Sequence, residues 1–182
     1  MVAQVIWITG LSGAGKTTLA VDIVVRLQKL GLKPVLLDGD WLRKILKSNV
    51  PKNNEYSRDE RIDIAGRYAQ ICQTLSSQGF VVVIATISMF KEVYLWNRKN
   101  IPNYIEVYLK VPIKELRRRD PKKIYQRYYD GDLINVAGLD LVVDEPTSSD
   151  VVLDFELQSS IWENSEDLAE YLIQELNKLN LI

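Results

Sequence analysis

The stretch that decides the fold reads GLSGAGKT and occupies residues 10–17. It matches the pattern G-x-x-x-x-G-K-[ST] without a substitution, and it stands between an apolar, β-branched run and a segment of helical periodicity. Its glycines let the backbone curl, so that successive N–H groups face inward and can hold phosphate oxygens. The stretch therefore predicts a phosphate-binding loop, or P-loop, between a buried strand and a helix.

The predicted ligand of this loop is ATP with Mg²⁺. Lys16 can reach the β- and γ-phosphates, and the Thr17 hydroxyl is a candidate metal ligand. A chance glycine-rich turn is the plain alternative, but the strand and the helix that the motif requires both flank it. The residues predicted to bind ATP here are Gly10, Ser12, Gly13, Ala14, Gly15, Lys16, Thr17 and Thr18.

Outward from the loop, strand-like and helix-like segments alternate. Strands are predicted at residues 3–9, 34–37, 80–85, 104–111 and 151–155, and helices at 16–30, 40–46, 58–77, 89–97, 113–119 and 166–179. The alternation predicts one α/β domain over residues 1–182, with a mostly parallel sheet covered by helices on both faces. Residues 120–150 have no clear period and are expected to form a lid or binding loop.

The amino-acid composition limits the catalytic groups that the chain can use. The chain has 182 residues, a net charge of −1, no histidine and one cysteine. Without histidine there is no Ser/His or Cys/His catalysis and no histidine metal site, which leaves carboxylates, Lys, Arg, hydroxyls and a bound metal ion. The near-neutral charge gives no general attraction to nucleic acid or membrane, and no apolar stretch approaches a membrane span. The lone Cys72 fits a reducing cytoplasm and is expected to be buried in a helix.

Two carboxylates, Asp38 and Asp40, follow the second predicted strand. Ligands of such sheets bind beyond the carboxyl ends of the strands, so both carboxylates should face the P-loop. There they can hold metal-bound water or accept a proton from an attacking hydroxyl. The plain alternative is that Asp38 ends the strand while Asp40 caps the next helix. Arg43, one helical turn farther on, is predicted to bind an anionic group of the substrate.

A basic stretch, RDPKKIY at residues 119–125, opens the aperiodic segment. Positive charge that closes over a triphosphate suits phosphoryl transfer, and a solvated basic helix end is the alternative. Tyr125, Tyr128 and Tyr129 are spaced as on one helix face, which favours packing inside the lid over base stacking on RNA. A GTPase is disfavoured because no N-K-x-D tetrapeptide occurs. A catalytically silent nucleotide-binding module remains the alternative of another class.

The P-loop, residues 37–43, a serine after a strand and residues 119–125 occur in an order that resembles the adenylylsulfate kinases over residues 3–146. The resemblance implies a P-loop kinase fold, transfer of the ATP γ-phosphate to the ribose 3′-hydroxyl of adenylylsulfate in sulfate assimilation, Mg²⁺, and commonly a homodimer. It implies catalytic roles for Lys16, Asp38, Asp40 and Ser88. It also implies that Asp40 is linked to the metal and that Lys122 contacts ATP and substrate from the lid. The substrate contacts implied by position are Asp40, Arg43, Tyr56, Arg61, Ile87, Ser88 and Lys122.

Several departures from the family pattern fall on the acceptor side. Ile64 stands where the family has an asparagine, and Val136 stands where it has a second stacking aromatic residue. Residues 86–90, TISMF, are similar to a divergent branch that acts on cytidine diphosphoramidate in capsule-polysaccharide pathways. Adenylylsulfate is the first expected acceptor and cytidine diphosphoramidate the alternative. No covalent role is expected for Ser88, because no base is visible for it and direct in-line transfer needs none.

Overall fold

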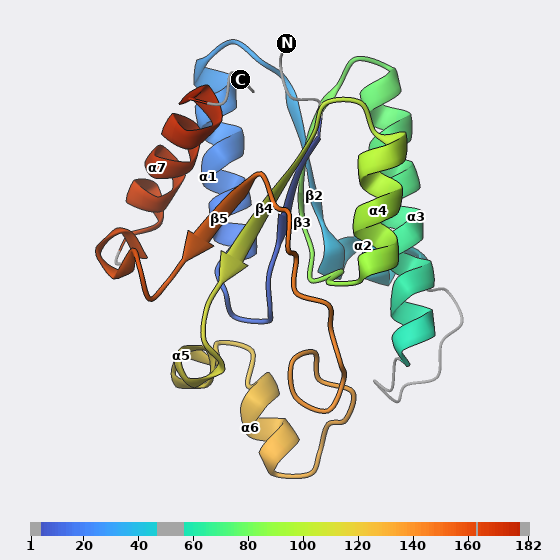
Figure 1. The fold of residues 1–182 in the computed structure, drawn as a ribbon, viewed down its shortest axis with the longest axis vertical. Helices are drawn as coiled ribbons and strands as arrows, with labels where there is room; N and C mark the ends of the chain where they lie inside the picture. The colour runs from blue at the N-terminus through green and yellow to red at the C-terminus, as the bar shows by residue number, and fades with distance from the viewer. Residues whose placement is uncertain (1–4, 47–56, 163, 179–182) are drawn as a thin grey trace.

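The computed structural model describes residues 5–46, 57–162 and 164–178. Its core is a five-stranded parallel sheet in the order β2-β3-β1-β4-β5. The strands are β1 Val5–Thr9, β2 Pro34–Asp38, β3 Val81–Ala85, β4 Tyr104–Lys110 and β5 Val151–Asp154. One face of the sheet is covered by α1 and α7 and the other by α3 and α4 (Figure 1). The predicted α/β fold, with helices on both faces of a parallel sheet, is confirmed.

The helices follow the sequence signals closely. They are α1 Lys16–Lys29, α2 Gly39–Leu46, α3 Arg58–Ser77, α4 Lys91–Asn100, α5 Ile113–Arg119, α6 Ile124–Tyr129 and α7 Ser165–Lys178, with a 3₁₀ turn, η1, at Ser159–Trp162. α3 begins with a capping box, in which the Ser57 side chain accepts from the Glu60 backbone N–H and the Glu60 carboxylate accepts from that of Ser57. β1 is buried at every position, as a central strand with two covered faces requires. None of the described helices is long and apolar enough to cross a membrane.

Both predicted ends of one helix were wrong, since α4 also runs to Asn100 and not to Asn97, and two short elements were missed. α4 begins at Lys91 and not at Met89, because Phe90 is extended and Ser88 has φ of 29°. The predicted lid contains α6, to which no helix was assigned although Tyr125, Tyr128 and Tyr129 are spaced as on one helix face. Its first turn is held by Asp120, whose carboxylate oxygens accept from the backbone N–H of Ile124 and of Gln126, both at 2.9 Å. η1 was also unpredicted, since four residues are too few to establish a period.

The cysteine of α3 allows a direct test of the packing. Cys72 is fully buried, and burial raises the pKa of its thiol to about 12. Because the thiolate is the reactive form, iodoacetamide at pH 8 is expected to modify the folded protein on the order of 10²-fold more slowly than the urea-unfolded chain. Mass spectrometry of timed samples measures both rates. Equal rates would mean that α3 does not cover this residue in solution.

Candidate functional site

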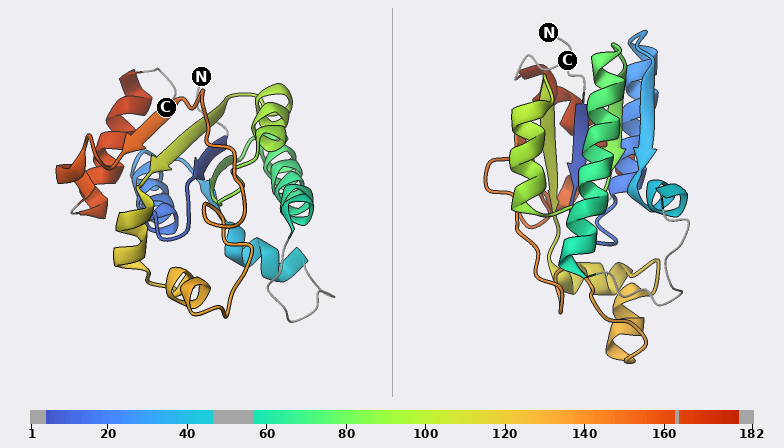
Figure 2. Two further views of the ribbon diagram at one scale, coloured as in Figure 1. Left: turned by 60° about the horizontal axis from the view of Figure 1, so that its bottom comes forward. Right: turned by 90° about the vertical axis from the view of Figure 1, so that its right-hand side faces the viewer.

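The candidate site lies at the carboxyl end of the sheet, where the P-loop, α2, α5 and α6 come together (Figure 2). The P-loop depends on glycine at its first position. Gly10 has φ of 146°, and a Cβ there would lie 2.7 Å from the Leu109 carbonyl oxygen of β4. The loop can therefore pass this close to the sheet only without a side chain, which fixes its N–H groups at the strand ends.

Lys16 is aligned across the P-loop. Its Nζ donates to the Leu11 carbonyl at 2.7 Å. Burial, together with the nearby positive charge of Lys122, lowers the pKa of Lys16 to about 7 against the opposing charges of Asp40 and Asp38. Thr18 follows on the exposed first turn of α1. An anionic phosphate placed against the loop would favour the charged form of Lys16 again.

Asp38 connects β2, α1 and α2. Its Oδ2 accepts from the Thr17 hydroxyl at 2.7 Å, and its Oδ1 accepts from the backbone N–H of Asp40 at 2.8 Å. Asp38, and not Asp40, therefore caps α2 and touches the P-loop hydroxyl. This corrects the plain alternative, in which Asp40 was the capping residue.

The arrangement of Thr17 and Asp38 fits Mg²⁺. Magnesium in kinases is commonly held by one or two protein oxygens together with substrate phosphates and water. A hydroxyl and a carboxylate side by side at the end of a P-loop supply that set. No group of three or more acidic, Cys or His side chains occurs among the described residues, so the chain offers no all-protein cage there. Metal linkage through Asp40 stays a prediction.

The Asp40 carboxylate contacts the lid segment. Lys122, 82 positions away in sequence, places its Nζ 2.5 Å from Asp40 Oδ2, and Arg43 bonds the other carboxylate oxygen. Burial raises the pKa of Asp40, but the hydrogen bond from Lys122 and the charges of Arg43, Lys122 and Lys16 outweigh burial and lower it. Asp40 is therefore an ionised carboxylate that lies among Lys122, Arg43 and Lys16, and the lid residue Lys122 contacts it directly.

Arg61 and Arg43, the two arginines predicted to bind the acceptor, lie near one another. Arg61, on α3, donates from Nη2 to the Asn135 carbonyl at 2.8 Å. Burial and the positive charge of Arg43 both lower the pKa of Arg61. Two guanidinium groups that repel one another in a partly buried space favour an anion between them.

Ser88 and Ile87 lie behind the site surface. Ser88 is 6% exposed, and its hydroxyl bonds the Thr86 hydroxyl at 2.7 Å. The Ile87 carbonyl accepts from the Thr9 hydroxyl. These contacts tie the ends of β3 and β1 together, and any contact of Ile87 or Ser88 with substrate stays a prediction. Tyr56 lies outside the described residues.

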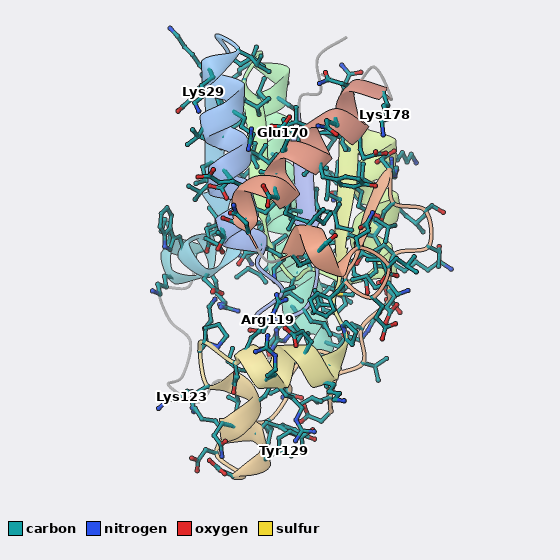
Figure 3. The ribbon with its side chains drawn as sticks, turned by 90° about the vertical axis from the view of Figure 1, so that its left-hand side faces the viewer. Lys29, Arg119, Lys123, Tyr129, Glu170 and Lys178 are labelled. Atoms are coloured by element: carbon teal, nitrogen blue, oxygen red, sulfur yellow. The ribbon has the colours of Figure 1, made fainter. Side chains whose placement is uncertain are left out.

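An aromatic surface around Arg119, which the sequence did not predict, lies at the end of α5. The Arg119 guanidinium lies 5.0 Å from the Phe155 ring and 5.7 Å from the Trp162 ring, and it also bonds Glu115. Figure 3 shows Arg119 beside α5, with Tyr129 farther out on α6. Arg119 is therefore held at α5 and is not a free charge of the lid. No local signal joins these residues, because they come from three separate segments.

A cavity of about 660 Å³ lies along α5 next to this surface. It is lined by Pro112, Lys114, Glu115, Arg117, Arg118, Asp120, Tyr125, Gln126, Tyr129, Phe155 and Glu156. The buried Tyr125 connects it to the P-loop, since its hydroxyl donates to the Ser12 carbonyl at 2.9 Å. Packing within the lid, the favoured interpretation of the tyrosine cluster, is confirmed for Tyr125.

Comparisons with known proteins agree with this geometry. Residues 2–154 match the family described as adenylylsulphate kinase. A cytidine diphosphoramidate kinase of Campylobacter jejuni is 37% identical over 172 residues, which span 94% of this chain and 95% of that protein. An adenylyl-sulfate kinase of Picosynechococcus is 32% identical over 177 residues, which span 97% and 95%. The structure of the Mycobacterium tuberculosis APS kinase in complex with AMPPNP and APS is similar with a TM-score of 0.83 at 27% identity, covering 96% of this chain and 98% of that one.

Proposed function

Since this chain belongs to the adenylylsulphate kinase family and is a kinase, we propose that it transfers the γ-phosphate of ATP to the ribose 3′-hydroxyl of a nucleotide-like acceptor. The observation that carries the proposal is the ionised Asp40, which lies between the P-loop lysine, the lid lysine Lys122 and the acceptor-side Arg43. A carboxylate in that position separates a phosphate-binding half of the site from an anion-binding half, as transfer between two bound nucleotides requires.

The phosphate-binding half of the site stabilises the ATP phosphates by positive charge held in fixed positions. The inward N–H groups of the P-loop and the Lys16 ammonium hold the β- and γ-phosphates, and the side chains of Thr17 and Asp38 would hold Mg²⁺. The metal ion, when bound, neutralises charge on the transferring phosphoryl group. Because Lys16 is already aligned by the Leu11 carbonyl, little reorganisation is needed at the moment of transfer.

The acceptor half orients the nucleophile. Arg43 and Arg61 bind the anionic group of the acceptor, which brings its ribose toward Asp40. Asp40 then orients the 3′-hydroxyl or accepts its proton, and this requires Lys122 to move from the carboxylate to the phosphates as the lid closes. The pair is exposed enough, at 53% for Lys122 and 42% for Asp40, that such an exchange costs little.

The base of ATP suits the aromatic surface beyond the P-loop. The Arg119 guanidinium lies over the Phe155 ring in a cation–π contact, and a purine ring can stack on the outer face of this pair. This surface lies beside the P-loop side of the site, away from Arg61. It leaves the region between α2, α3 and the lid for the acceptor.

Cytidine diphosphoramidate is the better-supported acceptor. Val136, at the position where the family pattern has a stacking aromatic residue, is 5% exposed and packs into the core beside β1 and α5. Ile64 offers no hydrogen bond to a base and packs against the other core cluster. Loss of one polar contact and one stacking face weakens recognition of an adenine base. The identity of 37% to a cytidine diphosphoramidate kinase over almost the whole of both chains supports the same choice.

Adenylylsulfate is the second candidate, favoured by the similarity to the mycobacterial APS kinase complex.

Coupled ADP release with Mg-ATP decides between the two acceptors. The expected result is turnover with cytidine diphosphoramidate at kcat/KM above about 10⁴ M⁻¹s⁻¹, and a value at least tenfold lower with adenylylsulfate. The reverse order would assign the protein to sulfate activation. ATP binding without turnover on either compound would contradict the proposal and support a non-catalytic nucleotide-binding module.

Restoring the residues of the family pattern at positions 64 and 136 gives a gain-of-function test. The double variant Ile64→Asn, Val136→Phe is expected to raise kcat/KM for adenylylsulfate, by about tenfold, because it restores a polar contact and a stacking ring. Val136 is buried, so the larger ring will also lower the free energy of unfolding by about 1–3 kcal/mol. Thermal unfolding of the same samples, with Ile64→Asn alone as the control, separates the two effects. An unchanged adenylylsulfate value in a folded double variant would remove these residues as the cause of selectivity.

A further inference from the structure

A compact turn follows α6 at residues 135–141. Asn135 has φ of 56°, in the left-handed region, and a single parallel bridge joins Ala137 to Leu141. The backbone N–H groups of Leu139 and Leu141 both donate to the Val136 carbonyl, at 3.0 and 3.2 Å. The turn is therefore a defined structure within a segment whose sequence has no period.

One side chain, that of Asp140, holds the start of this turn. Its Oδ2 accepts from the Asn135 backbone N–H at 2.7 Å, and its Oδ1 accepts from the Val136 backbone N–H at 2.6 Å. Both carboxylate oxygens are thus used on two consecutive N–H groups, in charge-assisted hydrogen bonds that fix the direction of the intervening peptide. They also favour the left-handed conformation of Asn135, which costs free energy in a non-glycine residue.

The turn contacts both halves of the site. The Asn135 carbonyl accepts from Arg61 at 2.8 Å on the acceptor side. On the phosphate side, Gly138 approaches the P-loop so closely that a Cβ there would lie 2.8 Å from the Leu11 side chain. Leu11 is the residue whose carbonyl accepts from Lys16. The turn therefore connects the two groups that bind the two substrates.

We propose that Asp140 is a positioning residue for acceptor binding: it fixes the 135–141 turn so that the Asn135 carbonyl holds Arg61 in the orientation that binds the anionic group of the acceptor. The proposal deepens the proposed function and rests on it for the role of Arg61. Asp140 itself does not touch the reacting atoms. It acts on Arg61 through the peptide between Asn135 and Val136 and through its own nearby negative charge, which opposes the lowering of the Arg61 pKa. Its removal should weaken acceptor binding far more than ATP binding.

Kinetics supply the first test, with whichever of cytidine diphosphoramidate and adenylylsulfate the wild-type protein turns over. Asp140→Ala is expected to raise the acceptor KM about tenfold, or about 1.4 kcal/mol, and to leave the ATP KM within about twofold. Asp140→Asn keeps one acceptor oxygen and should fall between wild type and Asp140→Ala. Asp132→Ala, an exposed carboxylate of the same lid segment, is the matched control and should change neither KM. Equal rises in both KM values would overturn the proposal.

A double-mutant cycle tests whether Asp140 acts through Arg61. In an Arg61→Ala background the effect of Asp140→Ala on acceptor KM should shrink to about twofold, because the group being positioned is gone. Full additivity would mean that the two residues act independently and would also overturn the proposal. Circular dichroism of all variants confirms that the comparison is made between folded proteins.

The second test needs no activity, so it separates failure of this inference from failure of the proposed function. Phenylglyoxal modifies accessible guanidinium groups, and peptide mass spectrometry gives the rate at each arginine. Arg61 is expected to react several-fold faster in Asp140→Ala than in wild type, while Arg67 on the same helix, which pairs with Asp63 and lies away from the turn, should react unchanged. Unchanged labelling of Arg61 would contradict the positioning role even in a protein that turns over neither acceptor.

Discussion

Replacing Lys16 with alanine is expected to lower kcat by on the order of 10²-fold or more. The lysine bonds the Leu11 carbonyl at 2.7 Å and so lies across the P-loop before any phosphate binds it. Its charge then stabilises the transferring phosphoryl group more than the ground state, so the loss should appear mainly in kcat. ADP release under saturating acceptor measures the effect.

A matched control separates local charge from general damage to α1. Lys29→Ala removes the same side chain from the exposed last turn of that helix and should leave kcat unchanged. Fluorescent-nucleotide binding should persist in Lys16→Ala, because the backbone N–H groups of the loop remain. Near-normal turnover in that variant would show that the P-loop is not where the transferred phosphate lies.

Asp40→Asn is expected to reduce kcat by about 10²-fold as well, within the range that general-base groups contribute. The amide keeps the shape of the carboxylate but removes the negative charge around which Lys122, Arg43 and Lys16 gather. It therefore can neither accept the hydroxyl proton nor hold the lid lysine as strongly. A pre-steady-state comparison of bound ATP and released ADP would place the loss in the chemical step.

The control for this variant is Asp63→Asn on α3, which also removes a carboxylate with an arginine partner but lies on the exposed face of its helix. It should leave kcat within about twofold, since such surface pairs contribute little. If Asp40→Asn retained wild-type kcat, the proton-accepting or orienting role would pass from Asp40 to water or to the buried Asp38.

Much of the fold could be predicted from the sequence because its signals are local. α3 and α5 have the predicted bounds, since a capping box starts the first and periodic apolar residues run through both. Elements without a strong local signal were missed for the same reason. α6 has only six residues and is started by the side chain of Asp120, which the sequence reading treated as part of a basic stretch.

The candidate site was only partly predictable, because its hydrogen-bonded side chains come from segments that are far apart in the sequence. Motif positions predicted that the P-loop, Asp38, Asp40 and Lys122 lie around one ligand, which stays a prediction. They did not indicate that Asp38 would touch Thr17 while Asp40 would touch Lys122. That division depends on how α2 turns away from β2, which only three-dimensional packing determines.

The close approach of Gly10 to β4 limits which positions of the site can be redesigned. A side chain at Gly10 would collide with the Leu109 carbonyl, so a substitution there would push the P-loop away from the sheet. No such backbone constraint holds at Ile64 of α3, whose side chain is only partly buried against a core cluster. A designer seeking a new acceptor should therefore begin with substitutions on α3 and leave the P-loop unchanged.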